Sequence, residues 1–301
     1  MKRDFLTLSD LSFKEINLLI KRAIELKSGK DLNKCPLIGK SIGLLFEKAS
    51  TRTRVSLEVG IYQLGAKSIY MNPGEIQIGR GETIRDTAKV LSRYLDAVII
   101  RTYSHDILTE FASHSFIPVI NGLSDLHHPC QALGDLMTVV EKKGRLRNIR
   151  LAYVGDGNNV ANSLIEAAAI MGIHLTLACP KGYEPDAGVF EKARMSAKGN
   201  ITIVNDAELA VSDSDVVYTD VWVSMGQEKE AAGKKQKFRK YQLNGKLLSY
   251  ARKDAIVLHC LPAHRGEEIT DEVMDGPRSV VFDQAENRLY TQKALLEFLL
   301  T

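Results

Sequence analysis

Apolar residues along this chain form short runs that alternate with longer amphipathic stretches. Short apolar runs bounded by turn residues predict buried strands, and apolar positions three or four residues apart predict helices. In the first half, the expected strands are residues 42–46, 67–71, 97–101 and 118–121, and the expected helices are residues 13–27, 51–64, 83–95 and 129–142. Thr83 followed by Asp86 predicts a capped start for the third helix.

The alternation restarts after a polar stretch at residues 142–148, which is either a hinge or a helix end. The strands expected beyond it are residues 149–154, 174–179, 201–204, 216–219, 256–259 and 280–282, and an apolar helix is expected at 291–300. Alternating strands and helices predict an α/β fold with two domains, each a parallel sheet flanked by helices. We expect domains at 1–143 and 144–285, with a C-terminal helix at about 286–301 packing back on the first. Residues 227–240 are charged and poor in apolar side chains, which predicts a solvated, mobile loop.

Composition narrows the class of protein. The chain has 301 residues, 45% of them hydrophobic and 26% charged, which is ordinary for a soluble globular protein. A net charge of +3 gives no support for nucleic acid or membrane partners, and no apolar stretch approaches the length of a membrane span. The four cysteines are far apart, the pattern of reduced thiols in a cytoplasmic protein, and the polar N-terminus lacks a secretory signal.

Ser50-Thr51-Arg52-Thr53-Arg54 lies between an expected strand and an expected helix. The first turn of a helix has unpaired N–H groups and a partial positive charge, so anions bind there. Arginine adds a fork of donors that suits phosphate oxygens. The segment therefore predicts a phosphate cradle, although an ordinary capped helix with solvated arginines gives the same short pattern.

Gly155-x-Gly157 at the start of the second domain invites comparison with dinucleotide-binding turns. The third glycine of that fingerprint is replaced by Val160, and the next strand ends in Cys179-Pro180-Lys181 without an acid for a ribose hydroxyl. A dinucleotide site is therefore disfavoured.

Other polar groups also follow predicted strands. They are Gln77, Arg101, His128, Asn159, Asp220, Cys260 and Arg288. The carboxyl ends of parallel strands share one edge of a sheet, so two such domains facing each other predict an active site in the cleft between them. Basic groups of the first domain would face amide, acid and thiol groups of the second, which suits a small phosphate compound and a partner bearing an amine.

Four motifs in register give the chain a family resemblance. They are Phe46-Glu47-Lys48-x-Ser50-Thr51-Arg52-Thr53-Arg54, His128-Pro129-Cys130-Gln131, Asp220-x-Trp222-x-Ser224-Met225-Gly226 and His259-Cys260-Leu261-Pro262. Together they resemble the ornithine carbamoyltransferases, within the aspartate/ornithine carbamoyltransferase family. The resemblance implies transfer of the carbamoyl group of carbamoyl phosphate to the δ-amine of L-ornithine, without a metal or an organic cofactor.

The resemblance also implies roles for individual residues. The set for carbamoyl phosphate is Ser50, Thr51, Arg52, Thr53, Gln77, Arg101, His128, Gln131, Cys260, Leu261 and Arg288. The set for ornithine is Asn159, Asp220, Ser224 and Met225, and the expected catalytic residues are Arg101, His128, Asp220 and Cys260. Gln77 matches a position that reaches a neighbouring subunit's site, so the resemblance implies a homotrimer.

Three alternatives remain from the sequence. A related carbamoyltransferase would act on putrescine or an acylated ornithine, which Ser224-Met225-Gly226 disfavours. A nicotinamide dehydrogenase would use the Gly155-x-Gly157 turn. A non-catalytic binding protein would keep the fold without the reaction.

Overall fold

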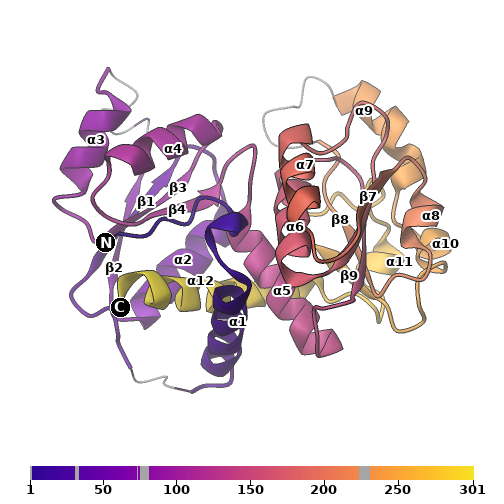
Figure 1. Ribbon diagram of the computed structural model, residues 1–301, viewed down its shortest axis with the longest axis horizontal. Coiled ribbons are helices and arrows are strands. Elements are labelled where there is room, and N and C mark those ends of the chain that lie inside the picture. Colours follow the sequence, from indigo (N-terminus) through magenta and orange to yellow (C-terminus); the bar gives the residue numbers. More distant parts are fainter. Residues whose placement is uncertain (1, 31–33, 73, 75–80, 224–230) are drawn as a thin grey trace. The chain divides into compact units, whose positions relative to one another are not determined.

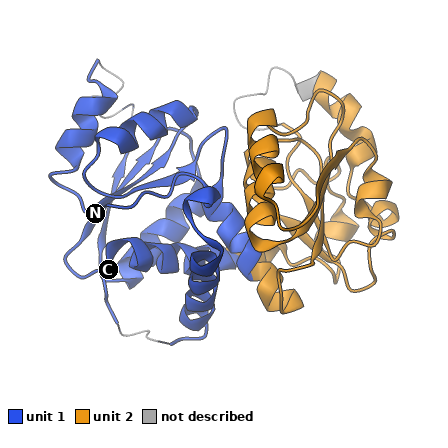
Figure 2. Cartoon of the chain, in the orientation of Figure 1, with its two compact units in different colours: residues 1–137, 286–301 blue, residues 138–285 orange. Residues whose placement is uncertain are grey.

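The computed structural model describes residues 2–30, 34–72, 74, 81–223 and 231–301. The chain divides into two compact units, Met1–Met137 with Glu286–Thr301, and Thr138–Ala285 (Figures 1 and 2). Each unit contains one wholly parallel sheet, as the strand–helix alternation predicts. Within the described ranges, no helix combines the length and apolar character needed to cross a bilayer.

The first unit has a four-stranded sheet in the order β2-β1-β3-β4. Its strands are β1 (Ser41–Phe46), β2 (Lys67–Met71), β3 (Ala97–Arg101) and β4 (Val119–Leu123). Its helices are η1 (Leu8–Asp10), α1 (Phe13–Lys27), α2 (Thr51–Gln63), α3 (Ile84–Leu91), α4 (His105–His114), the first turns of α5 (Pro129–Lys143) and most of α12 (Val281–Leu300). Strands β3 and β4 are buried throughout, because helices cover both faces of a parallel sheet.

Local sequence explains where these helices start and how they pack. Thr83 caps α3 by accepting a hydrogen bond from the Asp86 N–H at 3.1 Å, as the sequence predicts. Helices α3 and α4 pack on one face of the sheet through Ala88, Leu108 and Phe111. Helix α1 is held to α12 by Arg22, whose Nε lies 2.6 Å from Glu297 Oε2.

The second unit has a five-stranded sheet in the order β7-β6-β5-β8-β9. Its strands are β5 (Arg150–Val154), β6 (His174–Ala178), β7 (Ile201–Val204), β8 (Val216–Thr219) and β9 (Ile256–His259). Its helices, besides the end of α5 and the start of α12, are α6 (Asn159–Met171), α7 (Ala187–Ser196), α8 (Ala207–Val211), α9 (Ala231–Phe238), η4 (Arg239–Tyr241), α10 (Gly245–Leu248) and α11 (Asp271–Met274).

Two sequence expectations for this unit are wrong. Residues 280–282 do not form a strand: Ser279 makes one isolated bridge to Val257, and α12 begins at Val281. No glycine or proline follows to stop a helix, so α12 starts ten residues before the expected position. Of the mobile loop expected at 227–240, residues 227–230 lie outside the described residues; the described part contains α9, and the Lys234 side chain there is only 4% exposed. Composition alone could not reveal that a buried carboxylate holds this lysine.

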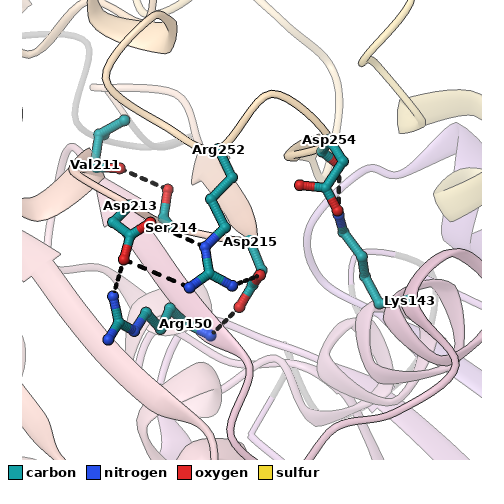
Figure 3. Close-up of polar contacts among 8 residues, drawn as sticks. All are labelled: Lys143, Arg150, Val211, Asp213, Ser214, Asp215, Arg252 and Asp254. Carbon is teal, nitrogen blue, oxygen red and sulfur yellow. Dashed lines mark hydrogen bonds and ion pairs between the residues drawn. The ribbon is translucent and has the colours of Figure 1, made fainter.

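An ion-pair cluster stabilises the edge of the second sheet where β5, β8 and β9 begin (Figure 3). Asp215, whose side chain is 5% exposed, accepts the Arg150 backbone N–H at 2.8 Å and the Arg252 Nη1 at 2.6 Å. Arg252 also contacts Asp213, which lowers the pKa of that exposed carboxyl through a hydrogen bond and charge attraction. Asp215 thus links the starts of two strands to the segment before a third.

Replacing Asp215 with alanine is expected to lower the free energy of unfolding by about 2–3 kcal/mol, because two donors lose a buried carboxylate. Urea unfolding measures this loss. Asp213→Asn is the matched control, since asparagine tolerates the positive φ of 57° at this position and the Asp213 pairs are exposed. A similar loss in both variants would contradict the assignment.

Candidate functional site

The loop between β1 and α2 forms the first part of the site. Ser50 caps α2 by accepting the Thr53 N–H at 3.2 Å, which leaves Thr51 and Arg52 in the exposed first turn. Thr53 is 1% exposed and its Oγ1 accepts a hydrogen bond from Arg288 Nη2 at 2.7 Å. Arg54 points elsewhere, because it pairs with Glu58 and lies over the Tyr70 ring. A helix N-terminus with hydroxyls and an arginine beside it is suited to an anion.

Arg101, His128 and Arg288 come together within the first unit. They lie at the end of β3, just before α5 and in α12, and each is no more than 5% exposed. Burial, then Arg288, then Arg101 hold the pKa of His128 well below its usual value, so the imidazole is neutral at pH 7. A neutral imidazole can donate one hydrogen bond beside two fixed positive charges. The arrangement suits an anion with a carbonyl-like oxygen nearby.

Two contacts orient the neighbouring groups. Gln131 is 1% exposed and its Nε2 donates to Asp135 Oδ1 at 2.8 Å, which leaves the amide oxygen as its other polar end. A Cβ added at Gly134 would lie 3.1 Å from Arg288 Cγ, so glycine allows Arg288 to lie close against α5. Neither effect is visible in the spacing of the sequence.

Residues that the sequence analysis gave no role connect the loops of this edge. Glu47 accepts hydrogen bonds from Thr102 Oγ1 at 2.6 Å and from the Tyr103 N–H at 3.2 Å. Lys48 pairs with Asp125 and lies 4.2 Å from the centre of the Tyr103 ring. Both belong to the motif quoted for the phosphate cradle, and they fix the β1–α2 loop against the loops after β3 and β4.

Asp220 is the centre of the second unit's polar edge. It follows β8, is 4% exposed, and its Oδ1 accepts the Val221 N–H and the Cys260 thiol, both at 2.8 Å. Its Oδ2 accepts Asn158 Nδ2 at 2.7 Å. The structure therefore brings Asp220 and Cys260 together, and it places Asn158 on the acid, whereas the sequence analysis selected Asn159. Asn159 is the first residue of α6, next to this contact.

Hydrogen bonds through His259 fix the turn that contains Cys260. The Leu261 N–H donates to His259 Nδ1 at 2.9 Å, so the imidazole proton lies on Nε2, which donates to Glu268 Oε1 at 3.1 Å. His259 and Glu268 are almost fully buried, and Leu261 has a positive φ of 58°. A bulky residue rarely adopts this conformation, so its surroundings must hold it.

Lys234 and Asp156 form a buried ion pair near Asp220. Lys234 Nζ contacts Asp156 Oδ2 at 2.7 Å and lies over the Tyr183 and Phe238 rings. Burial raises the pKa of Asp156 to about 6, although Lys234 acts in the opposite direction. Asp156 shares its loop with Asn158, and the Tyr153 hydroxyl bonds both residues. The pair therefore fixes the loop that presents Asn158 to Asp220.

The Gly155-x-Gly157 turn is filled by the protein itself. A Cβ on Gly157 would lie 2.2 Å from Pro185 N, and the Gly157 N–H donates to the Tyr183 carbonyl oxygen at 2.9 Å. In a dinucleotide site that close approach belongs to the pyrophosphate. The glycine here serves chain packing, which agrees with the sequence argument against a nicotinamide cofactor.

Gln77, Ser224 and Met225 lie outside the described residues. The remaining candidates form two groups, one in each unit. Most lie at or just after the carboxyl ends of strands, whereas Arg288 lies inside α12, because the strand expected before it at 280–282 does not form. The active site in the cleft between the domains stays a prediction.

The two halves of the chain match two family models. Residues 3–141 match the carbamoyl-P binding domain of the aspartate/ornithine carbamoyltransferases, and residues 147–299 match the Asp/Orn binding domain. The chain is 54% identical over 302 residues to the ornithine carbamoyltransferase of Syntrophus aciditrophicus, with 100% of each chain covered. It is 54% identical over 303 residues to that of Geobacter sulfurreducens, again with full coverage of both.

Solved structures of ornithine carbamoyltransferases are similar to this chain in fold and sequence. The ornithine carbamoyltransferase of Pyrococcus furiosus has a TM-score of 0.95 at 49% identity, with 99% of this chain and 97% of that chain covered. That of Thermus thermophilus has a TM-score of 0.91 at 42% identity, with 100% of both chains covered.

Proposed function

The chain belongs to the aspartate/ornithine carbamoyltransferase family, and from this premise we propose how its residues perform the reaction. It is an ornithine carbamoyltransferase: the carbamoyl group of carbamoyl phosphate passes to the δ-amine of L-ornithine, giving L-citrulline and phosphate. The observation that carries the site assignment is the pair of polar groups, cationic in the first unit and acidic in the second. The first unit then binds carbamoyl phosphate and the second binds ornithine.

The donor is bound by the first unit. The phosphate lies at the N-terminus of α2, where Ser50, Thr51, Arg52 and Thr53 supply hydroxyls, N–H groups and a guanidinium. Arg288, already bonded to Thr53, adds a second positive charge. The carbamoyl group lies by Arg101, His128 and Gln131, and the family resemblance adds Gln77, Cys260 and Leu261 to this set.

The acceptor is bound by the second unit. The carboxylate of Asp220 holds an amino group of ornithine, and Cys260 lies against the same carboxylate. Asn158, which bonds Asp220, joins Asn159, Ser224 and Met225 in this set. Three contacts, from the Val221 N–H, the Cys260 thiol and the Asn158 amide, keep Asp220 in one orientation before the substrate arrives, which lowers the cost of ordering the site.

The chemistry is acyl transfer. The neutral δ-amine attacks the carbamoyl carbon, a C–N bond forms, and the bond from that carbon to the phosphate oxygen breaks as phosphate leaves. The δ-ammonium has a pKa near that of lysine, so it first gives one proton to water. The second proton, which the nitrogen loses as the C–N bond forms, passes to the departing phosphate. The oxyanion that forms is stabilised by Arg101 and by the N–H of neutral His128; one such donor contributes ~3–4 kcal/mol. The donor is already activated, so the reaction needs neither a metal nor an organic cofactor.

The proposal extends to how the chain assembles and where in the cell it acts. Val55, Val59 and Tyr62 are 52%, 38% and 80% exposed along α2, and such an apolar stripe is typical of a surface that contacts another chain. It supports the homotrimer in which Gln77 would reach a neighbouring site. The four free thiols accord with the cytoplasm, and citrulline formation accords with arginine biosynthesis.

A colour assay for the ureido group of the product, with carbamoyl phosphate and one of three amines, tests the function. We expect product with L-ornithine and at least about 100-fold lower kcat/KM with putrescine or N-acetylornithine, because each lacks a charged group that the site recognises. A preference for putrescine or the acylated amine would replace ornithine as the substrate. Absence of a carbamoylated product with all three amines from a folded chain would overturn the proposal.

Replacing Lys234 with methionine is expected to raise the KM for ornithine about 10-fold, because Asp156 loses its buried partner and the Asn158 loop its anchor. Asp156 already has a raised pKa of about 6, so in the wild type kcat/KM for ornithine should fall as pH drops below that value. The variant removes the charge that lowers this pKa, so its acid limb should move to higher pH. The pH profile of kcat/KM measures both effects.

The matched control is Lys234→Arg, which keeps the charge and should stay near the wild-type profile. As pH falls, the contribution of Asp156 to the free energy of unfolding should change in the opposite direction to kcat/KM for ornithine. A carboxyl with a raised folded pKa binds its proton more tightly in the folded chain, so its contribution to stability grows as pH falls from about 6 towards 4. An unchanged acid limb in Lys234→Met would contradict the coupling.

A further inference from the structure

Three side chains just after the His259–Pro262 turn form a cluster outside the proposed active site. They are His264, Glu267 and Glu268, which are exposed, intermediate and buried, and one ligand atom from each lies within 4.8 Å of the others. A histidine and two carboxylates make a donor set that suits divalent first-row transition metals.

Glu268 points to a ligand. Its side chain is fully buried, and its Oε1 accepts hydrogen bonds from His259 Nε2 at 3.1 Å and from the His264 N–H at 2.5 Å. Its Oε2 has no hydrogen-bond partner among the described residues, and it lies 4.0 Å from His264 Nδ1. A buried carboxylate oxygen without a donor is costly, and a cation would satisfy it.

The two carboxylate oxygens of Glu267 also make separate contacts. Its Oε1 contacts Lys235 Nζ at 2.6 Å, and its Oε2 lies 4.0 Å from His264 Nδ1. In each glutamate, therefore, one oxygen is fixed by a protein donor and the other faces the same imidazole nitrogen. Outer contacts of this kind orient metal ligands before the ion arrives.

Size and charge agree with an ion of this class. Metal bonds of ~2.1 Å place neighbouring ligand atoms roughly 3.4 Å apart in a tetrahedral site. The two 4.0 Å separations from His264 Nδ1 need a small inward movement, and the two glutamates, whose ligand atoms lie within 4.8 Å of each other, would also move together. The two carboxylates and Lys235 leave one negative charge when His264 is neutral. Arg265 does not oppose a cation, because Asp271 and Asp275 hold it at 2.7 and 2.6 Å.

We propose that His264 Nδ1, Glu267 Oε2 and Glu268 Oε2 bind one divalent transition-metal ion, with water in the remaining positions. The site is separate from the carbamoyl transfer proposed above and does not depend on it. A chain of contacts links the metal site to the proposed active site. Glu268 would bind the ion through Oε2 and accepts a hydrogen bond from His259 through Oε1. His259 in turn accepts the N–H of Leu261, the residue next to Cys260.

The test is a Co²⁺ titration of the untagged full chain, followed by visible absorption and equilibrium dialysis. A second candidate cluster, Asp220 with His259 and Cys260, would also attract the ion, but it contains a thiol. Cobalt bound there gives a near-ultraviolet thiolate charge-transfer band that Cys260→Ser removes. Cobalt at the proposed site gives visible ligand-field bands without that band, and Cys260→Ser should keep them.

The variants His264→Ala and Glu267→Gln should weaken the Cys260-independent binding at least ~10-fold. Both replace partly exposed side chains, so the fold is expected to survive. Glu191→Gln and His114→Ala, which change an exposed glutamate and a partly exposed histidine elsewhere, are the matched controls and should bind as the wild type does. Unchanged cobalt binding in His264→Ala, or no binding once Cys260 is replaced, would overturn the proposal.

Discussion

The Arg288→Met variant is expected to lose about 10³-fold in kcat/KM for carbamoyl phosphate, which corresponds to ~4 kcal/mol of transition-state stabilisation. Arg288 is 4% exposed, donates to Thr53 Oγ1 at 2.7 Å, and is one of the two guanidiniums beside His128. Its loss removes a positive charge from the donor site and leaves Thr53 without its orienting partner. Steady-state kinetics with citrulline detection, at saturating ornithine, measures the change.

A pH profile separates this role from a packing defect. Arg288 is, after burial, the largest cause of the low pKa of His128, so Arg288→Met should raise that pKa and move the acid limb of kcat/KM to higher pH. Arg22→Met is the control, because Arg22 also contacts α12, through Glu297, but lies outside the candidate site. If both variants lost activity equally, or if Arg288→Met kept the wild-type acid limb, Arg288 would be structural only.

Much of this architecture could be predicted from the order of residues. Strands β3, β4, β8 and β9 are buried throughout, so they appear in the sequence as near-continuous apolar runs, whereas no residue of the edge strand β2 is buried. Parallel strands then bring their carboxyl ends to one edge. Arg101, Asp220 and Cys260 follow strands, and the structure places them at those ends. Ser50 caps the start of α2, as both the cradle and the ordinary capped helix require, and phosphate binding there stays a prediction.

Other features depend on contacts between distant residues, and no local pattern encodes them. Arg288 meets Thr53 across 235 positions of sequence, and Lys234 meets Asp156 across 78. Lys234 lies in a segment whose composition indicates a solvated loop, yet one buried carboxylate fixes it. Val280 to Phe282 has the composition of a strand, but only one isolated bridge forms next to it, and the helix-forming residues that follow determine its conformation.

The sequence alone could not decide which of two neighbouring asparagines caps α6. Either asparagine of the turn could cap α6, and the sequence analysis chose Asn159 for the site. In the structure, Asn158 is the cap: its Oδ1 accepts the Val160 and Ala161 N–H groups, which turns its Nδ2 towards Asp220. The capping geometry thus decides which amide bonds Asp220, and the role predicted for Asn159, contact with ornithine itself, stays a prediction.

Asp220→Asn should reduce kcat/KM for ornithine more than 100-fold, since a charge-assisted hydrogen bond to an ammonium contributes ~3 kcal/mol. The amide keeps the shape and can still accept from Asn158, but it cannot pair with a cation, and an NH₂ group would face either Asn158 or the donors Val221 N–H and Cys260. Binding of carbamoyl phosphate, measured by calorimetry, should change less than about threefold, because all the residues proposed for it except Cys260 and Leu261 belong to the other unit. Cys260→Ser keeps a donor to Asp220 and should lose only about tenfold, while Asp213→Asn, an exposed acid of the same unit, should act as the wild type. Equal losses for the two substrates in Asp220→Asn would mean that this carboxylate supports the fold of the turn rather than the amine.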